Sequence, residues 1–153
     1  TYQQIMQVSG RAGRGEKPGR VFIQTRASEA PVIRALLDGD GARFYAMETE
    51  SRRIANAPPF GRFAAIIVSD TDGALARETA HRIGKIAPHQ DGLDVYGPAE
   101  APLAVLRGRH RFRLLVHARR GVDLQAIVRK WLGQIDWKST TRVSVDIDPY
   151  SFV

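Results

Sequence analysis

Strand-like and helix-like segments alternate in a definite order after the proline pair Pro58-Pro59. Residues 63–69 form an apolar run rich in β-branched side chains, which is typical of a strand. Residues 72–87 and 123–135 carry apolar side chains at helical spacing. A further strand is predicted to begin at residues 93–96, and others are predicted at 110–118 and 143–147. The order β-α-β-β-α-β predicts a ferredoxin-like, split βαβ domain, in which two helices cover one face of an antiparallel sheet.

The residues before the proline pair predict a less regular region. Prolines cannot continue a helix, and each pushes the residue before it towards extended geometry, so we place a domain boundary there. Upstream we expect the end of a helix at 1–9, a glycine-rich loop at 10–19, a strand at 21–25, a helix from Pro31 and a helix at about 42–54. One face of the Pro31 helix should be apolar, formed by Val32, Ile33, Leu36 and Leu37. The fold class is therefore α+β.

The charge of the chain favours a polyanionic ligand. Lys and Arg outnumber Asp and Glu by 23 to 16, which gives 153 residues a formal charge of +7. Such an excess favours contact with nucleic acid or with a phosphate-bearing ligand. A basic surface that binds nothing is the alternative that charge alone leaves open.

The composition also limits which kinds of metal site and cross-link the chain can have and where in the cell it is expected. The sequence contains no Cys, which excludes disulfides and thiolate metal sites and fits a cytoplasmic protein. No apolar run approaches the roughly 18 residues that span a bilayer, so we expect no membrane contact. We expect no bound metal, because metal-ligand spacing is absent from His81, His89, His110 and His117. The first residue is Thr1, within an expected helix, so we expect a piece of a longer protein.

Residues 7–15, which read QVSGRAGRG, carry the most specific chemistry. Arg11 and Arg14 stand three residues apart on a glycine-rich turn and can converge on one phosphate. Arginine suits this task because its charge is permanent and its planar fork matches phosphate oxygens. The small residues Gly10 and Gly13 permit close backbone approach.

This stretch resembles the last conserved motif, motif VI, of superfamily 2 helicases, whose pattern is Q-x-x-G-R-x-G-R. The resemblance implies that Arg14 acts as an arginine finger on the nucleotide and that Arg11 also faces its phosphates. It implies that Gln7 couples the nucleotide to DNA. Many DNA and RNA motors share this motif, so it does not identify a family by itself.

The second half of the chain resembles the carboxy-terminal domain of the primosomal replication-restart helicases, the PriA or primosomal protein N′ family. The most similar stretches are residues 96–103 (YGPAEAPL) and 106–116 (LRGRHRFRLLV). Residues 50–53 followed by 58–61 match that family's bridge between motor and terminal domain, and 146–149 match its closing strand. The resemblance covers essentially the whole chain.

The resemblance implies a bacterial 3′-to-5′ DNA helicase that restarts stalled replication forks by primosome assembly. The full-length parent would bind ATP and Mg²⁺, and its zinc sites would lie upstream of this chain. The phosphate-cradling glycine loop of such motors is absent here, because Gly84-Lys85 is flanked by Thr79 and Ile86 where a glycine and a hydroxyl belong. We therefore expect the chain alone to bind no cofactor and to have no ATPase activity.

A row of arginines is the best candidate for DNA contact, with forked or single-stranded DNA as the expected ligand. Residues 101–122 contain six arginines and no acidic residue. Strand alternation places Arg109, Arg111 and Arg113 on one face, and Arg107 precedes them. Such a row can follow phosphates without reading bases. A solvated sheet face, or ion pairing elsewhere in a larger enzyme, is the alternative.

A second candidate lies at Arg119, Arg120 and Gln125, between the arginine-rich strand and the next helix. In the resembling family, single-stranded-DNA-binding protein docks through an acidic tail, and this pair of arginines could receive a carboxylate. A plain charged turn explains the same residues equally well.

We expect three parts: residues 1–30, the end of a second RecA-like lobe; residues 31–58, a helical bridge; and residues 59–153, the ferredoxin-like domain. Two other functions remain open. The chain could be a docking module for single-stranded-DNA-binding protein or other primosome proteins with no DNA contact of its own. It could also be the end of another superfamily 2 motor.

Overall fold

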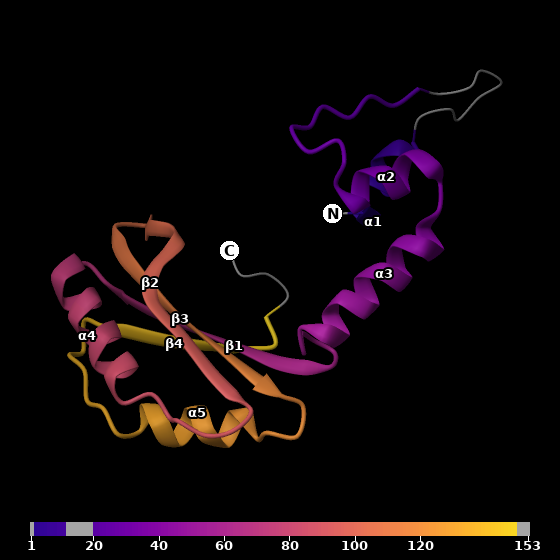
Figure 1. The fold of residues 1–153 in the computed structure, drawn as a ribbon. Helices are drawn as coiled ribbons and strands as arrows, with labels where there is room; N and C mark the ends of the chain where they lie inside the picture. The colour runs from indigo at the N-terminus through magenta and orange to yellow at the C-terminus, as the bar shows by residue number, and fades with distance from the viewer. Residues whose placement is uncertain (1, 12–19, 150–153) are drawn as a thin grey trace. The chain divides into compact units, whose positions relative to one another are not determined.

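A computed structural model describes residues 2–11 and 20–149 of the chain (Figure 1). The chain divides into two compact units, Thr1–Ser51 and Arg52–Val153, which are described separately below. None of the helices in the described ranges has the length and apolar character needed to cross a bilayer.

The first unit is helical. Its elements are α1 (Tyr2–Ser9), α2 (Pro31–Asp38) and most of α3 (Gly41–Ile54), which confirms the predicted helices. Pro31 occupies the first turn of α2, where its missing N–H has no helical partner to lose, and Gly39 ends α2 in the left-handed conformation at φ 68°. The ring of Tyr2 stacks on Phe44 with centroids 4.8 Å apart, so aromatic contacts hold α1 against α3.

One expectation for the first unit is wrong. Residues 21–25 form no strand, because the hydrogen bonds of a strand need a neighbouring strand and none lies beside this segment within the described residues. The predicted apolar face of α2 is only partly buried: Ala35 is its buried residue, whereas Leu37 is 75% exposed.

The second unit has the predicted order of strands and helices. Its elements are β1 (Gly61–Asp70), α4 (Gly73–Lys85), β2 (Leu93–Leu106), β3 (Arg109–Arg119), α5 (Leu124–Leu132) and β4 (Arg142–Ile147). The strands form one sheet in the order β2-β3-β1-β4, and every neighbouring pair is antiparallel. The α+β class is confirmed.

Both helices of the second unit begin at an aspartate that caps their first turn. The Asp72 carboxylate accepts hydrogen bonds from the backbone N–H groups of Ala74 and Leu75 at 2.9 and 3.2 Å. The Asp123 carboxylate accepts one from the backbone N–H of Ala126 at 3.0 Å, which is the usual role of aspartate at a helix start.

The core lies between the sheet and these two helices, which Figure 1 shows on one side of the strands. Alternate residues of β1 and β3 enter it, as a period of two requires. Trp131 of α5 is 2% exposed, and its indole N–H donates to the carbonyl of Ile83 on α4 at 3.1 Å. The core consists of Ala64, Ile66, Val68, Ala76, Ala80, Ile83, Leu93, Phe112, Leu114, Val116, Ala118, Leu124, Val128 and Trp131.

Strand β2 begins at Leu93, as predicted. It continues past Tyr96 through Gly97 and Pro98 and ends at Leu106. The register against β3 shifts between Tyr96 and Ala99 and again after Glu100. Since β2 is an edge strand, a proline and irregular pairing are tolerated there.

Candidate functional site

The predicted nucleotide motif begins at the end of α1. The helix closes with hydrogen bonds from Gly10 N to Met6 O at 2.9 Å and from Arg11 N to Val8 O at 3.2 Å. The side chains of Gln7 and Arg11 are both exposed, so both can reach a ligand. Gly13 and Arg14 lie outside the described residues. The roles assigned to this motif therefore stay predictions.

The backbone register places the arginine row on the sheet. Buried Phe112 and Leu114 face the helices, and Arg109, Arg111 and Arg113 between and beside them face the other way, half-buried. Arg107 lies in the β2–β3 turn at φ 51° and is exposed. The predicted alternation is confirmed, although Arg107 belongs to the turn and not to the strand. Whether these residues bind DNA stays a prediction.

Arg109 is engaged with the protein itself. Its guanidinium donates to the carbonyl of Ser69 at 2.8 Å and to the carbonyl of Thr140. It thereby connects β3, the end of β1 and the turn before β4. Arg111 donates one N–H to the carbonyl of Leu103 at 3.3 Å. Arg109 therefore braces the sheet, a role that strand alternation alone does not reveal.

The second predicted site lies on the connection from β3 to α5. Arg119 ends β3, Arg120 follows in the turn, and Gln125 is the second residue of α5; all three side chains are exposed. The Arg119 guanidinium pairs with the Asp91 carboxylate at 3.3 Å. Because this ion pair is exposed, it is weak, and a ligand carboxylate could compete for the guanidinium.

Sequence reasoning missed a buried carboxylate at the end of β1. Asp70 is 1% exposed and accepts hydrogen bonds from the hydroxyls of Thr141 at 2.7 Å, Thr140 at 2.9 Å and Thr71 at 3.3 Å. The Asp72 N–H donates at 3.0 Å. These bonds, that from Asp72 first, lower the pKa of Asp70 from its usual 3.8 to about 2, while burial opposes the shift. The cluster ties the start of α4 to the turn before β4.

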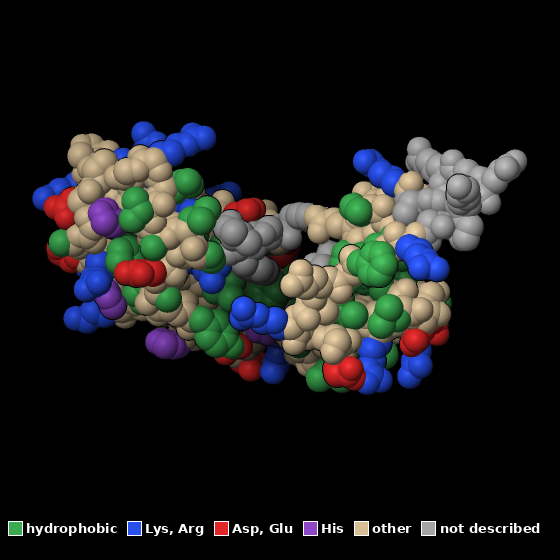
Figure 2. All heavy atoms as spheres, turned by 90° about the horizontal axis from the view of Figure 1, so that it is seen from above, with side chains coloured by type: hydrophobic (Ala, Val, Ile, Leu, Met, Phe, Trp, Pro, Cys, Tyr) green, Lys and Arg blue, Asp and Glu red, His purple; other side chains and the backbone are tan. Residues whose placement is uncertain are grey.

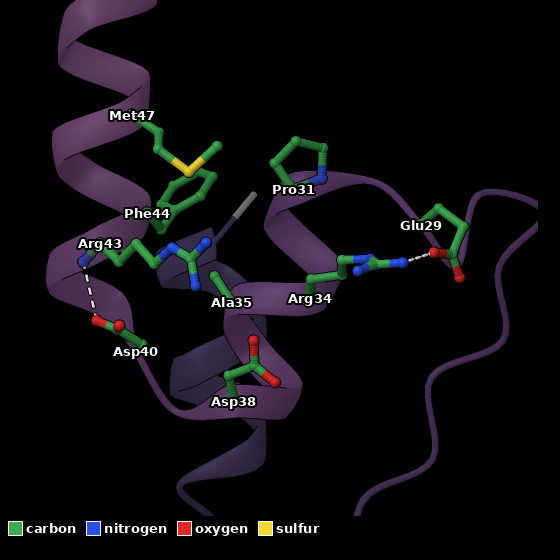
Figure 3. A pocket seen from close by; sticks show the side chains of 9 residues that line it. All are labelled: Glu29, Pro31, Arg34, Ala35, Asp38, Asp40, Arg43, Phe44 and Met47. Atoms are coloured by element: carbon green, nitrogen blue, oxygen red, sulfur yellow. Dashed lines mark hydrogen bonds and ion pairs between the residues drawn. The ribbon is translucent and has the colours of Figure 1, made fainter.

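The first unit contains a pocket of about 170 Å³ between α2 and α3 (Figure 3). Its wall combines apolar side chains with charges of both signs. The Arg34–Glu29 ion pair lies at one end, and the Asp40 carboxylate accepts a hydrogen bond from the backbone N–H of Arg43 at 2.9 Å. The lining residues are Glu29, Pro31, Arg34, Ala35, Asp38, Asp40, Arg43, Phe44 and Met47. None of them belongs to a predicted motif.

Net charge alone does not locate the site on the surface. On the face drawn in Figure 2, Lys and Arg side chains lie at several separate places with acidic side chains among them. The geometry therefore offers two specific candidates: exposed donors at the end of α1 and the arginine-bearing face of the sheet.

Comparison with known proteins identifies the family. The family described as "Primosomal protein N C-terminal domain" matches residues 53–150. Replication restart protein PriA of Rickettsia prowazekii is 36% identical over 99% of the chain, and the PriA proteins of Bacillus subtilis and Haemophilus influenzae are 34% and 31% identical over 98% and 96% of it. The chain spans 23%, 19% and 20% of these three relatives. The chain thus belongs to the family of the primosomal protein N C-terminal domain.

Proposed function

We propose that the chain is the C-terminal part of an ATP-dependent 3′-to-5′ DNA helicase of bacterial cytoplasm that restarts stalled replication forks by primosome assembly. One observation carries this proposal: similarity to replication restart proteins extends over 99% of the chain, well beyond residues 53–150. It therefore includes residues 7–15, in which the helicase motif lies.

In this proposal the end of α1 supplies the last part of an ATP site. Arg14 stabilises charge on the transferred phosphoryl group, Arg11 contacts the phosphates, and Gln7 relays nucleotide state to DNA. The exposure of Gln7 and Arg11 fits residues that meet a nucleotide held by other parts of the protein. ATP with Mg²⁺ would supply the phosphoryl group and neutralise its charge. The chain alone would not hydrolyse ATP.

The proposed organisation has three parts: the end of a RecA-like lobe at residues 1–30, a helical bridge at 31–58, and a ferredoxin-like domain at 59–153. Support for the last part comes from the strand order β2-β3-β1-β4, with two helices on one face. The zinc sites of the full-length protein would lie upstream, because this chain has no Cys.

The terminal domain would contact forked or single-stranded DNA through its arginine row. Its other partners would be single-stranded-DNA-binding protein, received at Arg119, Arg120 and Gln125, and further primosome proteins. The basic face of the sheet supports DNA contact over a docking module without DNA, because the arginines lie in register on one surface.

The test is Arg14→Ala in the full-length protein that carries this sequence. We expect DNA-stimulated ATP turnover to fall about 10³–10⁵-fold, since an arginine finger contributes that much to phosphoryl transfer. Binding of the same DNA, measured by fluorescence anisotropy, should persist.

Arg26→Ala is the matched control, because Arg26 is an exposed arginine outside the motif. Its ATP turnover should equal that of the wild type. Full turnover in Arg14→Ala would rule out the proposed finger.

A further inference from the structure

The second unit has a sheet face that its helices α4 and α5 leave uncovered, here called the open face. Side chains on it belong to residues that alternate with the core residues of each strand. Its members are Asp94, Tyr96, Ala99 and Leu106 of β2; Arg109, Arg111, Arg113, Leu115 and His117 of β3; Phe63, Ala65, Ile67 and Ser69 of β1; and Arg142, Ser144 and Asp146 of β4.

One end of the open face meets the segment that leads into the sheet. The imidazole Nε2 of His117 lies 3.0 Å from the carbonyl of Asn56, and the His117 ring packs on Phe63 with centroids 5.0 Å apart. A Cβ at Gly61 would lie 1.7 Å from the same carbonyl, so this segment is closely fitted to the sheet. The rows beyond His117 form the part of the open face that can receive a ligand.

Those rows change from apolar to basic along the strands. Tyr96, Leu115 and Ala65 are direct cross-strand partners, and Tyr96 is 54% exposed. The basic end follows within two rows, each about 7 Å from the last. Arg113 pairs with Ile67 in the next row, and Ser69 in the row after it is flanked by Arg111 and Arg142.

The arginines of this face divide by their contacts. Arg109 donates to the backbone carbonyls of Ser69 and Thr140 and acts as a brace. Arg111 uses one of its five N–H donors on Leu103, which orients the guanidinium and leaves others for a ligand. Arg142 is exposed on the edge strand β4. A phosphate chain would therefore meet Arg111 and Arg142.

We infer that single-stranded DNA lies on the open face, with phosphates at Arg111 and Arg142 and one base stacked on the ring of Tyr96. The inference rests on the proposed DNA contact and specifies its strandedness. An exposed ring beside apolar Leu115 and Ala65 offers a platform for a base, and only an unpaired base presents its face to it. Duplex DNA would contact the arginines through its phosphates and would not stack on Tyr96, because its bases are paired and stacked on one another.

Acidic residues limit where the DNA backbone can lie on the open face. Asp146 stands in the apolar row itself, beside Ala65 at the β4 edge, and Asp94 stands one row past it, beside His117 on β2. Phosphates avoid both. The strand therefore starts at Tyr96 on the β2–β3 side and crosses the basic row from Arg111 towards Arg142 on β4.

The experiment titrates the 153-residue chain into labelled oligo-dT and into a duplex of equal length, by fluorescence anisotropy at two salt concentrations. Tyr96→Ala should weaken binding to oligo-dT about tenfold, because stacking on one aromatic ring is worth about 1–3 kcal/mol per base. Its salt slope and its duplex affinity should not change. Tyr96→Phe keeps the ring and should bind as the wild type does.

Arg111→Gln and Arg142→Gln should weaken binding to both DNAs, and each should reduce the salt slope by about 1. Lys130→Gln is the matched control, since Lys130 is exposed on α5, on the other side of the sheet, and should change neither. Should Tyr96→Ala unfold, Tyr96→Leu keeps apolar bulk without the ring.

The outcomes separate the two proposals. If Tyr96→Ala and Tyr96→Leu fold and bind oligo-dT as tightly as the wild type, stacking on Tyr96 is ruled out. The proposed DNA contact still holds in that case if Arg111→Gln and Arg142→Gln reduce the salt dependence of binding. Duplex affinity that falls with Tyr96→Ala also overturns the single-strand assignment. Binding that does not depend on salt removes the proposed DNA contact itself, and with it this inference.

Discussion

The two units of the chain differ in how they bury apolar side chains. Nearly all buried hydrophobic residues lie in the second unit, whereas the described residues of the first unit bury only Tyr2 and Ala35. The first unit also exposes large apolar side chains, including Phe22 at 89% and Leu37 at 75%. Because apolar burial drives folding, the second unit is stabilised by its own core and the first is held by few contacts.

The family boundary agrees with this difference. The match to the primosomal protein N C-terminal domain begins at residue 53, and the second unit begins at Arg52. The helices of the first unit have 8, 8 and 14 residues, lengths at which isolated helices are marginal in water. A region with its own core can act as a domain, and a region without one depends on packing elsewhere.

The largest expected difference between the units is in the free energy of unfolding after a large apolar side chain in each is replaced by alanine. Trp131→Ala should lower the free energy of unfolding by about 3–5 kcal/mol, because it opens a cavity and removes the indole donor from the Ile83 carbonyl. Leu37→Ala should change it by less than about 0.5 kcal/mol, since this side chain is already exposed. Urea unfolding followed by circular dichroism measures both. Equal losses would mean that the first unit has a core of its own.

Acid should act on the second unit through Asp70. Its folded-state pKa of about 2 lies below the usual 3.8, so its contribution to stability is complete above about pH 4 and is lost as the pH falls towards 2. Urea unfolding at several pH values should show a smaller decline in Asp70→Asn, because the amide does not titrate.

The control for this pH series is Asp136→Asn, which alters an exposed carboxylate and should keep the wild-type decline. An unchanged decline in Asp70→Asn would assign acid sensitivity to other groups. Acid sensitivity would then no longer distinguish the second unit through Asp70.

Local patterns were enough to predict the order of strands and helices in the second unit. The apolar residues that alternate in 110–118 and those at helical spacing in 123–135 include the residues that β3 and α5 bury in the core. The start of β2 at residues 93–96 was predicted, but its continuation through Gly97-Pro98 to Leu106 was not. An edge strand can absorb that dipeptide through a shift in register, which only pairing with β3 reveals.

The candidate site was predictable in part. Alternation correctly placed Arg111 and Arg113 on one face, but the bracing of Arg109 joins residues 31 and 40 positions apart, which local spacing cannot encode. Arg142 was missed because it joins the arginines only through pairing of β4 with β1. The predicted strand at residues 21–25 failed for a related reason, since a strand needs a partner that local sequence does not specify.

The smallest expected effect concerns that same segment and gives the sharpest test of the first unit. Phe22→Ser in this chain should change the free energy of unfolding by less than about 0.5 kcal/mol, because 89% of the side chain is exposed and little apolar surface leaves the protein interior. Urea unfolding of the two proteins side by side measures the difference.

The same substitution in the longer protein of the proposed function separates two explanations of this exposure. If residues 21–25 pack against upstream motor residues, Phe22→Ser should destabilise the longer protein by more than about 1 kcal/mol while leaving this chain unaffected, since a buried aromatic contributes that much or more. An equal, near-zero effect in both would mean that Phe22 is a surface residue in each. The low burial of the first unit would then be a property of the unit and not of a missing partner.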